Sequence, residues 1–108
     1  MNFYEDCDGV TEAMGFFASG ISCNVKGVND GKPDLGVIYS PRPCSGAGVF
    51  TTNDVKAAPV QYCINLLQDS DQRYHGVVAN SGNANACTGA QGEADCAKMA
   101  SETARQLK

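Results

Sequence analysis

The chain has 108 residues, of which 43% are hydrophobic and 19% are charged, and its formal net charge is −4. A chain of this length holds at most one hydrophobic core, so we expect residues 1–108 to form a single unit with no internal linker. The basic residues are outnumbered and never clustered, which argues against a nucleic-acid or anionic-membrane partner. No apolar run approaches the roughly 20 residues of a membrane-spanning helix, and we expect a soluble, cytoplasmic protein.

Six cysteines are many for this length, and they occupy positions 7, 23, 44, 63, 87 and 96. The acidic first residues resemble no secretion signal, so we expect a reducing compartment and free thiols that serve mainly as small core residues. The sequence contains no Cys-x-x-Cys, and the lone His75 has no neighbouring cysteine, so no metal site is predicted. Cys87 is the exception, because it approaches a predicted helix where a thiolate is stabilised; a thiol enzyme using Cys87 is one alternative, without an assigned base.

In chain order, the first half has the composition of β structure. Residues 16–25 and 34–40 are predicted strands, joined as a hairpin through the turn signal Asn29-Asp30-Gly31. Pro41 and Pro43 are expected to end the second strand, and residues 45–52 to form a third. Residues 61–67 fit a strand or a helical turn equally well.

The second half predicts a strand, a loop and a helix. Residues 75–79 are apolar and are expected to form a buried strand. A helix is expected from Gly92 onward, with Glu93 and Asp95 in its first turn and Arg105 and Lys108 in its last, the charge order that the helix dipole favours. One face of this helix is apolar and consists of Cys96, Met99, Ala100, Thr103 and Leu107.

The predicted fold class is therefore α/β with mixed α+β layers, in which N-terminal strands precede a strand, a Gly/Asn-rich loop and a helix. A single convincing helix covers at most one face of a sheet. We therefore expect an incomplete portion of a larger fold.

The Gly/Asn-rich loop, residues 80–89, is the part of the chain richest in amide side chains. Its backbone N–H groups near a helix N-terminus suit a carboxylate, a phosphate or a developing oxyanion, although the glycine patterns of nucleotide-binding loops are absent. The alternative is a purely structural loop, in which asparagines cap turns and Gly82 and Gly89 adopt positive φ. The candidate residues for a site wall or structural loop are Asn80, Ser81, Gly82, Asn83, Asn85, Thr88 and Gly89.

Residues 80–89, taken together with residues 48–60, resemble the bifunctional ornithine acetyltransferase / N-acetylglutamate synthase family. The family's opening pattern is also present at residues 9–11 and 15–16, and its helix after the loop matches Gly92 onward. The resemblance covers essentially the whole chain and corresponds to the N-terminal part of the family's α chain.

The resemblance implies an acyltransferase of arginine biosynthesis, a glutamate N-acetyltransferase that moves acetyl from N-acetylornithine to glutamate. No cofactor is implied, although some members accept acetyl-coenzyme A as a substrate. In this family the precursor cleaves itself, and a threonine at the new N-terminus of the β chain attacks the acetyl carbonyl, with its own amine as base. A threonine–glycine pair contributes to the oxyanion hole, where one donor is worth about 3–4 kcal/mol.

Both catalytic elements are expected in segments that follow Lys108, so no catalytic residue is expected in this chain. Thr51-Thr52 and Thr88-Gly89 imitate a nucleophile and an oxyanion pair, but both match other motifs of the family. The resemblance implies that this chain is inactive by itself. It also implies that the chain associates with the rest of the α chain and with the β chain, as α2β2. The alternative is a non-catalytic binding or scaffold module derived from the same fold.

Overall fold

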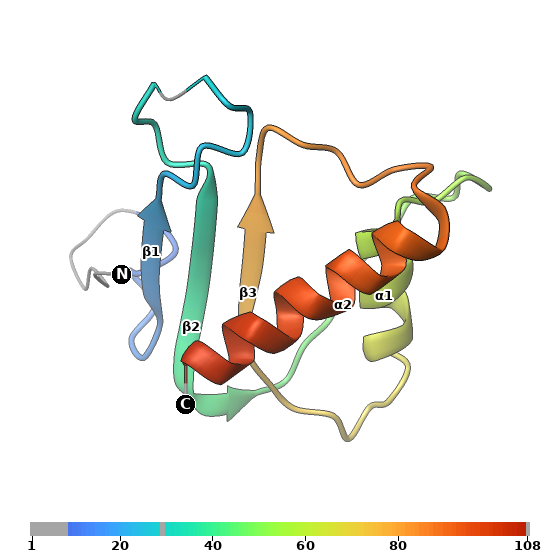
Figure 1. Cartoon of the computed structure of the whole chain (residues 1–108). Helices are drawn as coiled ribbons and strands as arrows, with labels where there is room; N and C mark the ends of the chain where they lie inside the picture. The colour runs from blue at the N-terminus through green and yellow to red at the C-terminus, as the bar shows by residue number, and fades with distance from the viewer. Residues whose placement is uncertain (1–8, 29, 108) are drawn as a thin grey trace. The chain divides into compact units, whose positions relative to one another are not determined.

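The computed structural model describes residues 9–28 and 30–107. Its elements confirm the mixed α/β class (Figure 1). In chain order they are β1 (Phe17–Ile21), β2 (Leu35–Cys44), α1 (Ala58–Leu66), β3 (Tyr74–Asn80) and α2 (Gly89–Gln106).

The described residues fall into two compact units, each built from two separate stretches of chain. The sheet unit consists of residues 9–44, except the undescribed position 29, together with residues 75–84. The helical unit consists of residues 45–74 and 85–107. The chain crosses between the units three times, and the last crossing lies within the Gly/Asn-rich loop.

The sheet unit holds a three-stranded sheet in the order β1-β2-β3. β1 and β2 are antiparallel, with Phe17 opposite Tyr39 and Ile21 opposite Leu35, which confirms the predicted hairpin. Figure 1 shows β3 running antiparallel to β2 on its other side. Val37 in the central strand is the buried apolar residue of this unit, with 4% of its surface exposed.

The long hairpin connection is held by Asp34. Its two carboxylate oxygens accept the N–H groups of Cys23 and Val25, each at 2.6 Å, and its own N–H donates to the Ile21 carbonyl at 3.0 Å. These donors, Cys23 first, lower the pKa of the Asp34 carboxyl. Because the carboxylate satisfies the N–H groups that follow Ile21, β1 ends there, earlier than the predicted residue 25.

The expectation that two prolines end the second strand was wrong, since β2 continues through Pro41 and Pro43 to Cys44. β1 pairs with β2 only from residue 35 to residue 39. Beyond that point β1 supplies no partner for β2, so the nitrogens of Pro41 and Pro43 lose no ladder bond to β1 there.

The predicted third strand was also wrong, because residues 45–52 form neither strand nor helix. The Asn53 N–H donates to Thr51 Oγ1 at 3.2 Å, a local bond that competes with strand pairing. Gly46 lies so close to Tyr74 that a Cβ would be 2.7 Å from Tyr74 Cδ2. The glycines here therefore permit close packing of a loop.

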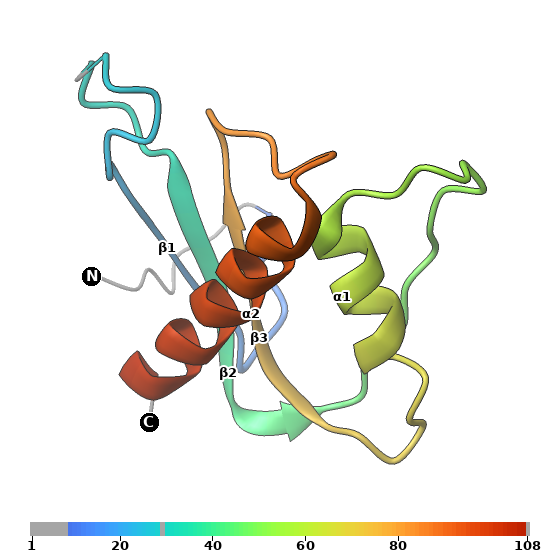
Figure 2. The same ribbon diagram turned by 45° about the vertical axis from the view of Figure 1, so that its right-hand side comes forward.

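The helical unit contains α1 and α2, which pack against each other (Figure 2). α1 settles the ambiguity over residues 61–67 in favour of a helix, and Pro59 lies in its first turn, where a missing N–H has no intrahelical role. α2 begins at Gly89, three residues before the expected start. Its first turn is therefore not acidic as predicted, whereas Arg105 does lie in its last turn.

The predicted apolar face of α2 is confirmed. Cys96 is buried, and Met99, Ala100, Thr103 and Leu107 are half-buried. The charged residues Asp95, Lys98, Glu102 and Arg105, which lie off this face, are exposed.

Two expectations about burial were wrong. β3 lies at the edge of the described sheet and is mostly exposed, with 62% of Val77 accessible. Among the described cysteines, only Cys96 is buried; Cys44 is half-buried and Cys23, Cys63 and Cys87 are exposed, and all five are free. Cys7 lies outside the described residues.

No helix within the described ranges combines the length and the apolar character needed to cross a bilayer.

Candidate functional site

The two halves of the Gly/Asn-rich loop belong to different compact units. Residues 80–84 belong to the sheet unit, and residues 85–89 belong to the helical unit. The predicted candidates accordingly divide into Asn80, Ser81, Gly82 and Asn83 on one side and Asn85, Thr88 and Gly89 on the other.

The first half of the loop continues the sheet. The Ser81 N–H donates to the Asp34 carbonyl at 2.8 Å, and Asn80 Nδ2 donates to the Asn83 carbonyl at 3.4 Å. Gly82 has φ of 93°, and a Cβ there would be 2.9 Å from Lys26 Cγ. The predicted positive φ is confirmed, and these contacts hold the turn that follows β3.

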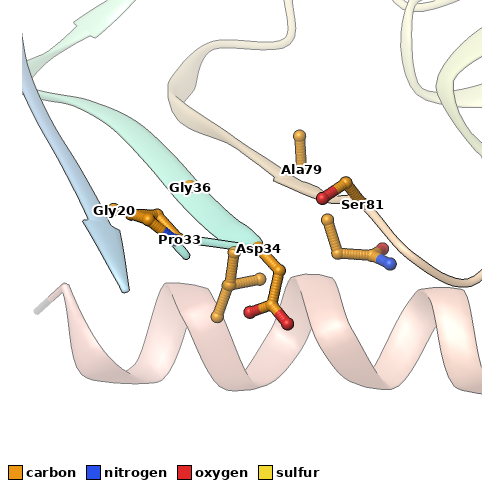
Figure 3. Close-up of a pocket in the computed structure, with 8 residues that line it drawn as sticks. Gly20, Pro33, Asp34, Gly36, Ala79 and Ser81 are labelled. Carbon is orange, nitrogen blue, oxygen red and sulfur yellow. The ribbon is translucent and has the colours of Figure 1, made fainter. Parts of the chain in front are cut away.

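This half of the loop borders an open hollow of about 280 Å³ in the sheet unit (Figure 3). Its apolar lining is contributed by Gly20, Pro33, Leu35, Gly36 and Ala79, which we call the glycine hollow. Asp34, Asn80 and Ser81 form its polar rim. The sequence patterns did not identify Asp34 or Gly36 as candidate residues. The one pattern that could have indicated this hollow was the presence of a glycine inside each of the two predicted strands.

The second half of the loop organises the N-termini of both helices around Asn85. Its amide Nδ2 donates to the Gly92 carbonyl at 2.7 Å, and its backbone carbonyl accepts the Ala58 N–H at 3.2 Å. The Thr88 hydroxyl donates to Asn85 Oδ1. Gly92 is buried directly against these two side chains, where a Cβ would overlap both. Asn85 therefore ties the start of α1 to the first turns of α2.

A second recess, of about 210 Å³, lies in the helical unit at the start of α2. It is lined by Lys56, Ala58, Gln61, Cys87, Thr88, Gly89 and Glu93. Lys56 Nζ donates to the Asn53 carbonyl at 2.7 Å, and Gln61 Nε2 donates to the Lys56 carbonyl at 3.2 Å. The recess thus combines an ammonium group, a carboxylate and an exposed thiol close to a helix N-terminus.

The threonines that imitate catalytic residues are engaged in local structure. Thr51 Oγ1 accepts the Asn53 N–H, and the Thr88 hydroxyl is bonded to an amide, which is neither an acid nor a base at neutral pH. Within residues 9–28 and 30–107, no group of three or more His, Cys, Asp or Glu side chains is placed to hold a metal ion. Both halves of the loop make hydrogen bonds that fix local backbone geometry.

Comparison with known proteins defines the class of this α/β chain. Residues 17–108 match the model of the ArgJ family. The match covers more than half of the chain, and the chain therefore belongs to the ArgJ family, as the resemblance of residues 48–60 and 80–89 had implied.

Two curated relatives carry the name arginine biosynthesis bifunctional protein ArgJ. The protein from Thermotoga neapolitana is 46% identical over 93 residues, which are 86% of this chain and 23% of the relative. The protein from Symbiobacterium thermophilum is 48% identical over 99 residues, 92% of this chain and 24% of the relative. The chain thus spans about a quarter of the length of these relatives.

Two solved structures share the fold. Ornithine acetyltransferase from Mycobacterium tuberculosis, crystallised in complex with ornithine, is 44% identical with a TM-score of 0.73 and covers 82% of this chain and 44% of that one. The arginine biosynthesis bifunctional protein ArgJ from Bacillus halodurans is 39% identical with a TM-score of 0.74 and covers 85% of this chain and 46% of that one.

Proposed function

We propose that this chain is the N-terminal part of an acetyltransferase of arginine biosynthesis that transfers acetyl from N-acetylornithine to glutamate. The single observation that carries the proposal is the match of residues 17–108 to the ArgJ family. The 44% identity to an ornithine acetyltransferase crystallised with ornithine supports the substrate class.

In the proposed reaction a threonine outside these 108 residues acts as the nucleophile. Its hydroxyl attacks the acetyl carbonyl and forms an acetyl-threonine, ornithine leaves, and the glutamate amine then takes the acetyl group. The reaction uses no bound cofactor, and a bifunctional enzyme also accepts acetyl-coenzyme A as a substrate. The described residues contribute framework, because Asn85 and Thr88 are committed to the start of α2.

The proposal includes the partners of the chain. The remainder of the α chain and the β chain of the same precursor complete the site, in an α2β2 assembly. The cytoplasmic location stays a prediction, since the relatives include fungal proteins designated mitochondrial, such as that of Neurospora crassa.

The experiment compares the purified 108-residue chain with the product of its intact gene. Each is incubated with N-acetylornithine and glutamate, and N-acetylglutamate is quantified by mass spectrometry. We expect no transfer by the chain alone and transfer by the intact gene product, with one acetyl group recovered on a threonine-containing peptide when glutamate is omitted. Transfer by the chain alone, or an intact gene product without transfer, would contradict the proposal and favour the binding-module alternative.

A further inference from the structure

Two glycines face each other across the first two strands, and nothing in the described chain requires them to be glycine. Gly20 of β1 is paired with Gly36 of β2, and neither has a positive φ. A Cβ on Gly20 would lie 3.5 Å from Pro33 Cβ, and one on Gly36 would lie 3.8 Å from the Ser19 carbonyl oxygen. Both distances are ordinary van der Waals contacts, so the strand pair has room for two side chains that it lacks.

Gly76 in the same sheet is, by contrast, a position where the described chain itself requires glycine. A Cβ there would overlap the Ile38 carbonyl oxygen, so the close approach of β3 to β2 accounts for this glycine. Glycine in a strand interior weakens the strand and often marks a bulge, a tight bend or the close approach of another group. β1 and β2 pair residue for residue through Gly20 and Gly36, so no bulge accounts for these glycines, and no described residue approaches them closely. This pattern favours the approach of a group from outside the described chain.

The space that these glycines leave open is the glycine hollow. Figure 3 shows Gly20, Gly36 and Ala79, one residue from each strand, beside Pro33. The missing side chains make this end of the sheet shallow and flat, which allows another backbone or an apolar side chain to come close.

The main polar groups at the rim of the hollow already have hydrogen-bond partners within the sheet unit. Both carboxylate oxygens of Asp34 accept backbone N–H groups, and the Ser81 N–H donates to the Asp34 carbonyl. Asn80 directs its amide toward the Asn83 carbonyl. A small polar molecule would therefore meet an apolar lining with few free hydrogen-bonding groups. An apolar polypeptide segment would instead bury this lining favourably.

The described residues also bury little apolar surface. Val37 and Cys96 are the buried apolar residues among them, while Val77 of β3 is 62% exposed. The ArgJ relatives are about four times as long as the part that this chain matches. The polypeptide that completes the ArgJ protein is thus the occupant with the length to cover the hollow.

We propose that the glycine hollow is the docking surface for an apolar segment of the polypeptide that follows these 108 residues in the same precursor. This inference rests on the proposed function for the identity of the occupant. Gly20 and Gly36 admit the close approach, and Asp34 keeps the rim in place without bonding to the incoming segment.

The test expresses the 108-residue chain, tagged, and the remainder of its own gene product as two separate polypeptides in one cell. Co-purification of the remainder is measured for the parent and for Gly36→Leu, which fills the hollow, with Ala97→Leu on the exposed side of α2 as the matched control. We expect Gly36→Leu to reduce the co-purified remainder about tenfold or more, because overfilling a packed contact opposes binding. Ala97→Leu is expected to leave it unchanged.

A second variant separates an effect on docking from an effect on folding. Gly36→Ala adds one carbon that the strand pair accommodates, so the urea unfolding midpoint of the tagged chain is expected to be no lower than that of the parent. Its co-purification is expected to fall by about threefold, the effect of a smaller overfilling of the contact. If Gly36→Leu lowers the unfolding midpoint, Gly36→Ala decides the question.

Parent-like co-purification of both Gly36 variants would overturn the docking surface. So would a parent chain that associates with itself through the hollow instead of with the remainder. Acetyl transfer by the same preparations separates the two proposals: parent-like co-purification and transfer with both Gly36 variants refute docking alone, whereas hollow-dependent assembly of a parent without transfer refutes the proposed reaction alone.

Discussion

Gly76→Ala is expected to destabilise the sheet unit by forcing β3 away from β2. The new methyl carbon would overlap the Ile38 carbonyl oxygen and lie 3.4 Å from the Ile38 carbonyl carbon and from Tyr39 Cα. All three atoms belong to the backbone of the central strand, so no side-chain rotation relieves the collision. The strands must separate, which weakens the hydrogen bonds between them.

The magnitude follows from two opposing effects. Overpacking costs about 1–3 kcal/mol, and a rigid backbone obstacle places this substitution toward the upper end. Replacing glycine by alanine also lowers the conformational entropy of the unfolded chain, which stabilises the folded state by about 0.4–1 kcal/mol. The expected net loss is about 2 kcal/mol, which lowers the urea midpoint by about 1–2 M at the usual urea dependence for small proteins. Far-ultraviolet circular dichroism during urea titration measures this change.

Gly36→Ala is the matched control, because it makes the same chemical change in the same sheet. Its Cβ would have only the Ser19 carbonyl oxygen nearby, at 3.8 Å, so the midpoint is expected to stay level or rise. Equal midpoints for Gly76→Ala and Gly36→Ala would refute the steric reasoning, and with it the contrast on which the interpretation of the glycine hollow depends.

Three further predictions concern single side chains. Asn85→Ala removes the 2.7 Å bond to the Gly92 carbonyl and is expected to cost about 1 kcal/mol in urea unfolding, whereas Asn83→Ala is expected to have little effect. Because the folded pKa of Asp34 is lowered, its hydrogen bonds to Cys23 and Val25 are expected to be intact above the usual carboxyl pKa and to be lost as pH falls through the folded value. The amide proton chemical shifts of Cys23 and Val25 should follow that titration. The same pH-dependent change in Asp34→Asn would contradict this expectation. Burial, with a smaller contribution from the nearby Cys63, raises the pKa of the Cys96 thiol, so iodoacetamide is expected to label Cys96 more slowly than exposed Cys23, and equal rates by peptide mass spectrometry would count against this.

Local patterns in the sequence were sufficient for the hairpin and for the face of α2. Alternation and a turn signal specify β1 and β2, and a helical repeat specifies the side of α2 that carries Cys96. Both properties depend on residues that are neighbours in sequence or one helical turn apart. The family resemblance needed only the motifs themselves.

The errors arose where distant residues decide the structure. Pro41 does not end β2 because β1 stops pairing at Tyr39, and the early end of β1 depends on the Asp34 carboxylate. α2 starts at Gly89 rather than at Gly92; Asn85 and Thr88 pack against Gly92, and the Asn85 amide donates to the Gly92 carbonyl. No periodicity carries such information.

The candidate loop illustrates the same limit. Its composition identified the residues correctly as a group in sequence, but composition does not reveal that Ala84 and Asn85 fall in different units. Ser81 contacts Asp34 in the sheet, while Asn85 contacts Ala58 at the start of α1. These partners lie far away along the chain and could only be found in three dimensions.

The interleaved order of the two units has a consequence for biosynthesis. The hairpin of β1 and β2 emerges from the ribosome well before β3, and α1 emerges before α2, so each unit waits for a segment that is made after part of the other. Neither unit can be excised as one uninterrupted stretch of gene, and neither can finish folding until translation has passed residue 84. The nascent hairpin therefore exposes its unpaired edge during elongation, a period in which chaperone binding would be most valuable.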